Sequence, residues 1–146
     1  MINQFYIDKA LNAVVEAIQA EYIREYWAQK GYRVHVTENE DQWYQGKKSH
    51  DFKDSLGHLW EGKNDQYAWH SGNVYIERTV DDSAADMFIR IVEGRGWVTT
   101  REDLQTLLTQ YSEITQGGDS KRAIGTLVPK EAFYEASEEV LLRQYV

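Results

Sequence analysis

The chain has 146 residues, which is the size of one domain, since domains usually contain roughly 100–200 residues. Hydrophobic residues make up 42% and charged residues 27% of it, and these near-average fractions exclude the disordered, collagen-like and coiled-coil classes. Sixteen Lys and Arg residues against 24 Asp and Glu residues leave a formal net charge of −8, which favours solubility and does not help to gather nucleic acid. We therefore expect a single acidic domain over residues 1–146.

The chain contains no cysteine, which excludes disulfides, thiolate metal sites and cysteine nucleophiles. Its first residues include Asp8 and lack the apolar region of a signal peptide. No apolar run approaches the length needed to cross a membrane. The sequence therefore predicts a cytoplasmic protein with no membrane partner.

Residues 4–30 are predicted to form one amphipathic helix. Apolar side chains recur there at three- and four-residue steps, a period typical of a helix with one apolar face. They are Leu11, Val14, Val15, Ile18, Tyr22 and Tyr26. Gly31 is suited to follow the helix, because glycine readily adopts the left-handed conformation found just after a helix end. Alternating apolar and polar residues then predict a strand over 32–37.

The next predicted feature is a β-hairpin. Residues 51–53 lead into 54–57, whose sequence DSLG is typical of a turn, and residues 58–63 run back as the second strand. The polar segment 38–48 before the hairpin and the aromatic segment 64–72 after it are expected to be loops.

Strands and one helix are predicted in the middle of the chain. The β-rich composition of 73–79 and 88–92 predicts two strands, and 97–99 is expected to pair back on the second of them across a glycine-containing turn. Thr100 is a suitable N-cap because an acidic residue follows three positions later. Beyond it, leucines at helical spacing predict a helix with one apolar face.

A short strand over 123–128 and a C-terminal helix complete the predicted order. Pro129 is placed as the first residue of that helix, and Phe133, Ala136, Val140 and Leu141 are expected to continue it. The fold class is therefore α/β or α+β, with a central mixed sheet fed by the hairpin, an N-terminal helix and flanking C-terminal helices.

The hairpin concentrates the side chains that can carry chemistry. Glu61 and Lys63 are two residues apart on a strand and so share a face. With a turn centred near Leu56, Asp51 would lie opposite Glu61. Gly62 would offer an unobstructed backbone carbonyl between the charged residues.

Two carboxylates and a carbonyl are hard oxygen ligands of the kind that Mg²⁺ prefers. A lysine beside them can lower the pKa of an attacking water or stabilise negative charge in a transition state. Asp51, Glu61 and Gly62 are therefore the candidate ligands of Mg²⁺ or Mn²⁺, and Lys63 is the candidate catalytic lysine. This chemistry is typical of phosphodiester hydrolysis.

The order Asp51, Glu61-Gly62-Lys63 on a hairpin behind a long helix resembles the PD-(D/E)xK nuclease superfamily. The resemblance implies a restriction-endonuclease-like fold and a metal-dependent endonuclease. It also implies an acidic residue on the N-terminal helix, for which Glu21 is the first choice and Glu25 the second. His50 stands where the superfamily motif has proline, which leaves Asp51 and Asp54 as alternatives for the first motif residue.

One phage and resolvase-like branch of the superfamily resembles this chain further along. After the Glu-x-Lys strand that branch has an Asp, an aromatic residue and a TGN-hydrophobic-Glu run, which match Asp65, Tyr67 and the segment SGNVYIE at 71–77. The segment SAAD at 83–86 resembles a further part of the branch. The resemblance implies supporting roles for Asp65, Asn73 and Glu77, an origin in phage or mobile-element DNA processing, and a homodimer as the working form.

Two functions from different classes are consistent with the sequence. The first is a Mg²⁺-dependent deoxyribonuclease with DNA as its partner, in which Trp60, Tyr67 or Trp69 could stack on unpaired bases. The second is a non-catalytic acidic binding protein, such as an inhibitor or immunity-type partner, which would engage a basic surface. The charge of −8 suits the second function better than DNA capture.

Overall fold

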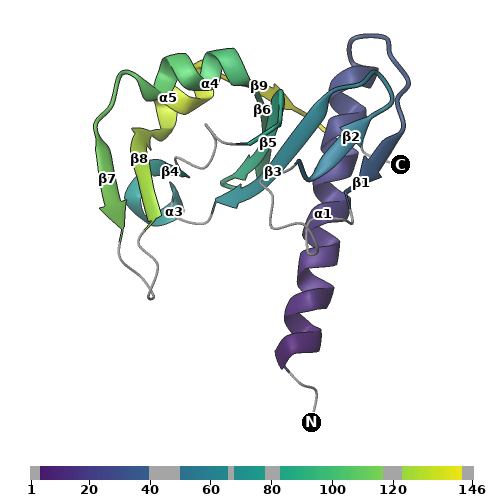
Figure 1. Ribbon diagram of the computed structural model, residues 1–146, viewed down its shortest axis with the longest axis horizontal. Coiled ribbons are helices and arrows are strands. Elements are labelled where there is room, and N and C mark those ends of the chain that lie inside the picture. Colours follow the sequence, from purple (N-terminus) through teal and green to yellow (C-terminus); the bar gives the residue numbers. More distant parts are fainter. Residues whose placement is uncertain (1–3, 40–49, 66–67, 78–82, 117–122, 143–146) are drawn as a thin grey trace.

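The computed structural model describes residues 4–39, 50–65, 68–77, 83–116 and 123–142 (Figure 1). The helices are α1 (Gln4–Ala28), α3 (Ala68–Ser71), α4 (Arg101–Leu108) and α5 (Lys130–Glu135). The strands are β1 (Val36–Glu38), β2 (Phe52–Asp54), β3 (Leu59–Asp65), β4 (Asn73–Glu77), β5 (Met87–Val92), β6 (Arg95–Thr100), β7 (Glu113–Gln116), β8 (Ala123–Pro129) and β9 (Glu138–Val140). The chain is thus mixed in class, with helices and two sheets.

The larger sheet has six strands in the order β1-β2-β3-β5-β6-β9. Its central pair, β3 and β5, is parallel, and the other neighbouring strands are antiparallel. The smaller sheet has the order β4-β8-β7 and is antiparallel throughout. The chain therefore leaves the large sheet after β3, adds β4 to the small sheet and returns as β5, and the parallel pair occupies the middle of the large sheet.

Helix α1 covers one face of the large sheet with its C-terminal half (Figure 1). Ile23 of the helix and Trp60 of β3 are both fully buried there, with exposed fractions of 0%. The core on this face consists of Ala20, Tyr22, Ile23, Tyr26, Phe52, Trp60, Met87, Ile89, Val98 and Val140. Among the described helices, none is long and apolar enough to cross a membrane.

The small sheet, α4 and α5 lie on the opposite side of the large sheet from α1 (Figure 1). Their core includes Phe88 and Trp97 from the large sheet, Val74 and Ile76 from β4, and Phe133 from α5. Alternate residues of β5 therefore enter different cores, because successive side chains of a strand point to opposite faces. Strands β5 and β6 are buried on both faces over most of their length, whereas β3 is half-buried at Glu61, Gly62 and Lys63.

Several local predictions are confirmed. The N-terminal helix ends before Gly31, which has a φ of +89°. The hairpin turns between β2 and β3, and the strand after it pairs in parallel with the predicted strand at 88–92. Thr100 caps α4, since its hydroxyl accepts a 3.1 Å hydrogen bond from the amide of Asp103.

The C-terminal helix is shorter than predicted and does not reach Leu141. Helix α5 ends at Glu135, and β9 follows and pairs with β6. The Ser137 hydroxyl donates to the Phe133 carbonyl at 2.7 Å and bonds the Thr99 hydroxyl at 2.8 Å, so this residue beyond the helix end is tied both to α5 and to β6. The next strand can then bury Val140 in the core against α1.

Other predictions at the element ends need correction. The strand expected over 32–37 is shorter and later, since β1 covers Val36–Glu38. The loop expected over 64–72 contains the end of β3 and the one-turn helix α3. Strand β7 was not predicted, because it has only four residues and follows closely on the predicted helix; it pairs antiparallel with β8, the next strand along the chain.

Candidate functional site

Asp54 anchors the hairpin turn and belongs to the core. Its Oδ1 accepts the amides of Leu56 and His58 at 3.0 Å each, and its Oδ2 accepts the indole N–H of Trp27 at 2.9 Å and of Trp60 at 2.8 Å. Burial opposes ionisation, but the hydrogen bonds from Trp60, His58 and Trp27 outweigh it and hold the pKa of Asp54 below its usual value. This carboxylate ties the turn to α1.

Asp51 lies at the start of the hairpin, beside the Glu-Gly-Lys segment of β3. Its amide donates to the Trp60 carbonyl at 2.8 Å, and its Oδ2 accepts the amide of Gly62 at 2.9 Å. Asp51 is thus bonded to the residue before Glu61 and to the residue after it. Of the two alternatives for the first motif residue, Asp51 is therefore the carboxylate next to Glu61, and Asp54 is engaged in the turn.

Glu61 has a buried carboxylate oxygen and a raised pKa. Its Oε2 is buried and has no hydrogen-bond partner among the residues that the structure describes. Burial raises the pKa of Glu61; the nearby charge of Lys63 lowers it, Asp51 raises it, Arg90 lowers it and Glu77 raises it. A buried carboxylate oxygen without a donor is costly to maintain, so Glu61 is expected to reduce the stability of the fold when it is ionised.

Arg90 is a second cation at the site, which the sequence alone did not single out. Its position in β5 is paired with Lys63 of β3, so both side chains lie on the same sheet face as Glu61. Burial lowers the pKa of the guanidinium, and the charges of Asp65, Glu61 and Glu77 oppose this. The sequence signal that could have identified Arg90 is its position as the one charged residue in the otherwise apolar strand MFIRIV.

Asp65 and Arg90 join the two sheets at the edge of β4. The Asp65 Oδ2 accepts the amide of Tyr75 at 3.3 Å, and the Arg90 guanidinium donates to the Tyr75 carbonyl at 3.4 Å. The Asp65 Oδ1 also accepts the amide of Ala68 at the start of α3. Asp65 thus connects the end of β3 to β4 and to the start of α3.

Helix α1 approaches the site from the other face of β3. A Cβ added to Gly62 would clash with the Gln19 side chain, lying 2.6 Å from its Cδ, so glycine here lets the buried Gln19 pack directly on the strand. One turn earlier, Glu16 is close enough to the site for charge coupling. Its pKa is raised by partial burial and by the charges of Glu38 and Asp51.

The structure does not bring Glu21 to the hairpin. Its carboxylate pairs within the helix with Arg24, at 2.8 Å. Glu25, the second choice, is buried on the C-terminal half of the helix, with an exposed fraction of 7%. The helical acid coupled to Asp51 is Glu16. Spacing counted back from Gly31 in the superfamily pattern does not select this residue.

The remaining predicted supporting residues have separate positions. Asn73 forms a turn with Ser71, whose hydroxyl accepts the Asn73 amide at 3.1 Å. Glu77 ends β4, near enough for its charge to raise the pKa of Glu61. Of the aromatic candidates, Trp60 is fully buried and Trp69 on α3 has an exposed fraction of 63%, while Tyr67 lies outside the described residues.

The donors at the site fit a divalent cation only in part. Within the described part of the chain, no group of three or more Asp, Glu and His side chains is arranged to hold a metal ion. The unpartnered buried oxygen of Glu61 is nevertheless the kind of hard ligand that Mg²⁺ takes. Two carboxylates, those of Asp51 and Glu61, would supply the protein ligands, and Mg²⁺ commonly keeps waters for its other positions.

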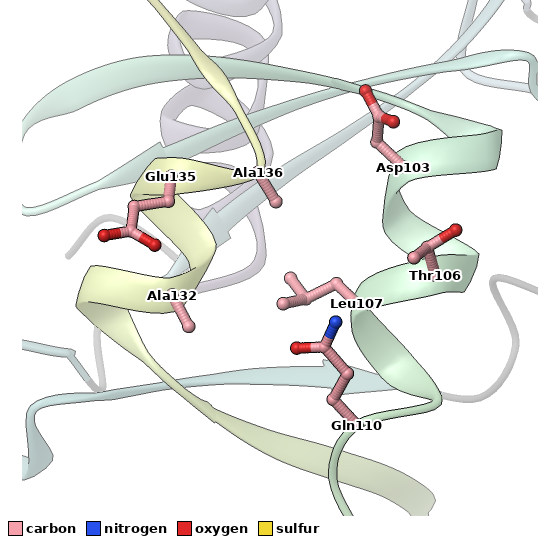
Figure 2. Close-up of a pocket in the computed structure, with 7 residues that line it drawn as sticks. All are labelled: Asp103, Thr106, Leu107, Gln110, Ala132, Glu135 and Ala136. Carbon is pink, nitrogen blue, oxygen red and sulfur yellow. The ribbon is translucent and has the colours of Figure 1, made fainter.

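A separate open pocket lies between α4 and α5, with a volume of about 340 Å³ (Figure 2). Its walls combine apolar side chains with the Asp103 and Glu135 carboxylates. The lining residues are Asp103, Thr106, Leu107, Gln110, Ala132, Glu135 and Ala136. None of them belongs to the hairpin, so this pocket is not part of the candidate site.

No protein-family model matches the chain, and no curated protein matches it significantly. Its function is therefore inferred from the residues and their geometry.

Proposed function

We propose that this chain is a metal-dependent deoxyribonuclease that hydrolyses phosphodiester bonds, with its site at Asp51, Glu61 and Lys63. The observation that carries the proposal is Glu61: a buried carboxylate oxygen without a hydrogen-bond partner in the described structure, beside a second carboxylate and a lysine. Carboxylates whose pKa is perturbed by burial and by specific charged neighbours are typical of functional sites.

Each residue has a distinct part in this proposal. Asp51 and Glu61 hold Mg²⁺ or Mn²⁺ through carboxylate oxygens, with the Gly62 carbonyl as a further candidate ligand. The bound cation supplies Lewis acidity and a water of lowered pKa. Lys63 lies two residues along the same strand face and positions or activates the attacking water. The Asp51 bond to the Gly62 amide holds the Asp51 carboxylate beside the segment that carries Glu61 and Lys63.

The architecture supports a restriction-endonuclease-like assignment within this proposal. A long helix packs on one face of a mixed sheet, a hairpin carries the acidic and basic residues, and the strand with Glu61 and Lys63 is central and runs parallel to its next neighbour. On helix α1, Glu16 is an acid whose pKa is raised in part by the charge of Asp51, whereas Glu21 pairs with Arg24.

The acidic binding protein is retained as a second candidate for a specific reason. The described residues hold no group of three potential metal ligands, and the net charge of −8 opposes DNA capture. Under this alternative the chain carries the same fold but engages a basic partner through its acidic surface.

Cleavage and metal binding decide between the two. The wild-type chain is incubated with duplex, single-stranded and branched DNA in the presence of Mg²⁺, Mn²⁺ or EDTA, beside Glu61→Gln and Lys63→Ala. We expect metal-dependent cleavage that falls by at least about a hundredfold in both variants, the usual scale for loss of a general acid–base or electrostatic group.

The matched control is Glu102→Gln, because this acid is exposed on α4, away from the hairpin. It should cleave like the wild type. Equal cleavage by Glu61→Gln and the wild type would assign the activity to a contaminant or another site. Absence of both cleavage and calorimetric Mn²⁺ binding would favour the acidic binding protein.

A further inference from the structure

Arg90 in β5 is a buried arginine whose guanidinium has few hydrogen-bond partners. The residue has an exposed fraction of 7%. Among the residues that the structure describes, its guanidinium forms one hydrogen bond, to the Tyr75 carbonyl, at the long distance of 3.4 Å. A guanidinium carries five N–H donors in a fixed planar arrangement. Most donors of this nearly enclosed cation are therefore without a protein acceptor in the described part of the chain.

The carboxylates around Arg90 do not take up these donors. The Asp65 Oδ2 lies 4.0 Å from a terminal nitrogen of the guanidinium, which is beyond hydrogen-bond distance. Burial lowers the pKa of Arg90, and the charges of Asp65 and Glu61 oppose this, so the three groups lie within range of one another. The buried Oε2 of Glu61 nevertheless has no hydrogen-bond partner among the described residues. A buried cation and a buried carboxylate oxygen thus lie near each other without bonding.

This arrangement is unlike that of a purely structural ion pair. A buried ion pair is maintained when direct contact and further hydrogen bonds satisfy its donors and acceptors. Arg90 has charged neighbours but makes no hydrogen bond to a carboxylate within the described structure. Its spare donors are those of a group that accepts an additional ligand.

The sheet register places a second cation beside Arg90. Arg90 is the partner of Lys63 across the parallel β3–β5 pair, and neighbouring strands are about 4.8 Å apart. Glu61 shares this face, because it is two residues from Lys63 on the same strand. Lys63 is half-buried, so the pair of cations is open to solvent on its side. An anion bound between the two cations would relieve their mutual repulsion.

The chemistry of the two side chains selects a phosphate ester. The planar fork of arginine matches two oxygens of a phosphate group, and lysine adds a compact positive charge. A phosphodiester has two non-bridging oxygens that share one negative charge and can accept hydrogen bonds from both side chains. The carboxylates of Asp51 and Glu61 oppose such an anion, so a change that removes one of these charges should strengthen its binding.

We propose that Arg90, together with Lys63, binds the non-bridging oxygens of a phosphodiester group. The identity of this anion as the substrate rests on the proposed function, but its binding requires neither a metal nor cleavage. Arg90 is then a substrate-binding residue of the site, contributed by the strand next to the hairpin.

Dimethyl phosphate is the probe, because it is a phosphodiester anion without bases or sugars. It is titrated in EDTA into the whole isotope-labelled chain, and the Arg90 Nε–Hε signal in NMR reports on the guanidinium. We expect this signal to shift in a saturable way. Arg90→Gln should raise the dissociation constant, followed through backbone amide shifts of β3, by at least about tenfold, the scale for lost hydrogen bonds to a charged group. Glu61→Gln should lower it.

Arg33→Gln is the matched control, because Arg33 is an exposed arginine in the segment between α1 and β1, and it should bind like the wild type. Arg90→Lys keeps the charge without the planar fork, so its affinity should lie between those of the wild type and Arg90→Gln. The wild-type Arg90 signal itself needs no substitution, so it remains a test if the Arg90 variants do not fold.

Two results separate this site from the nuclease assignment. An Arg90 signal that does not respond to dimethyl phosphate, or equal affinities for Arg90→Gln and Arg33→Gln, would overturn the phosphodiester site even if the wild type cleaves DNA. A saturable Arg90 shift that is weakened in Arg90→Lys supports the site. If the wild type then cleaves no DNA with Mg²⁺ or Mn²⁺, the nuclease assignment fails and the anion site stands.

Discussion

The Asp51 carboxylate accepts a 2.9 Å hydrogen bond from the amide of Gly62, the residue between Glu61 and Lys63. A side chain just before one hairpin strand thus holds the backbone of the other strand between Glu61 and Lys63, whose side chains share one face. The Asp51 carboxylate therefore acts both as a hydrogen-bond acceptor and as a negative charge. A substitution that removes the charge but keeps the acceptor separates these two effects.

Asp51→Asn should preserve the fold and alter the electrostatics. The amide oxygen can still accept the Gly62 hydrogen, so the free energy of unfolding should change by no more than about 0.5 kcal/mol. The charge of Asp51 raises the pKa of Glu61, so the variant should titrate Glu61 at lower pH. The measurement is the pH dependence of the Glu61 side-chain carbonyl chemical shift in NMR. If Glu61 titrates at the same pH in the variant and in the wild type, the charge of Asp51 does not influence Glu61. Cleavage activity should be lost in the same variant.

Glu61→Gln should stabilise the protein at neutral pH. Because the pKa of Glu61 is raised in the fold, ionisation opposes folding: the penalty is absent below the unfolded pKa of about 4.3 and complete above the folded pKa. The amide removes this charge, so the variant should be more stable by about 1 kcal/mol at pH 8. Urea unfolding at pH 8 and pH 3.5 is the test.

The difference between Glu61→Gln and wild type should shrink toward zero at pH 3.5, where the wild-type carboxyl is protonated. Glu102→Gln should be neutral at both pH values, since Glu102 is exposed. A destabilised Glu61→Gln at pH 8 would mean that the carboxylate has a structural partner and is no site for a ligand.

Asp54→Asn should destabilise the fold strongly, in contrast to Asp51→Asn. The introduced amide group cannot accept both indole N–H donors while its oxygen serves the turn amides, so the bonds to Trp27 and Trp60 are disrupted. Loss of hydrogen bonds to a charged acceptor should reduce the free energy of unfolding by about 3 kcal/mol. Urea denaturation followed by tryptophan fluorescence measures it.

The pH dependence of this contribution has a definite sign. Hydrogen bonding holds the pKa of Asp54 below its usual value, so its stabilisation is present above the unfolded pKa of about 3.9 and is lost as pH falls through the folded pKa. The difference in the free energy of unfolding between the wild type and Asp54→Asn should therefore decrease under acid conditions. A difference that stays constant down to pH 2 would contradict the assignment.

Gly62→Ala should test how closely α1 positions the site. The added Cβ would clash with the Gln19 Oε1 and lie 2.6 Å from its Cδ, so the side chain of Gln19 has to move. We expect a loss of about 1–2 kcal/mol, the scale of overpacking in a core. Combining it with Gln19→Ala removes the clash, so the second substitution should restore part of the stability. Simple additivity in this double-mutant cycle would show that the two residues do not compete for space.

Local patterns in the sequence determined the long helix, its end at Gly31, the hairpin turn and the cap at Thr100, because each depends on residues a few positions apart. Alternation along one strand likewise placed Glu61 and Lys63 on one face. Asp51, Glu61 and Lys63 were therefore predictable as neighbours, since all three lie on one hairpin.

Tertiary structure decided the rest, because it depends on pairings between segments remote in sequence. Pairing of β9 with β6 replaced the expected end of the last helix, and the parallel β3–β5 register brought Arg90 to the site. The placement of the helix against the sheet also leaves Glu21 paired with Arg24 and puts Glu16 within range of the charge of Asp51. Helical periodicity showed that α1 has an apolar face, but only the position of the sheet determined that Tyr22 is buried while Leu11 stays exposed.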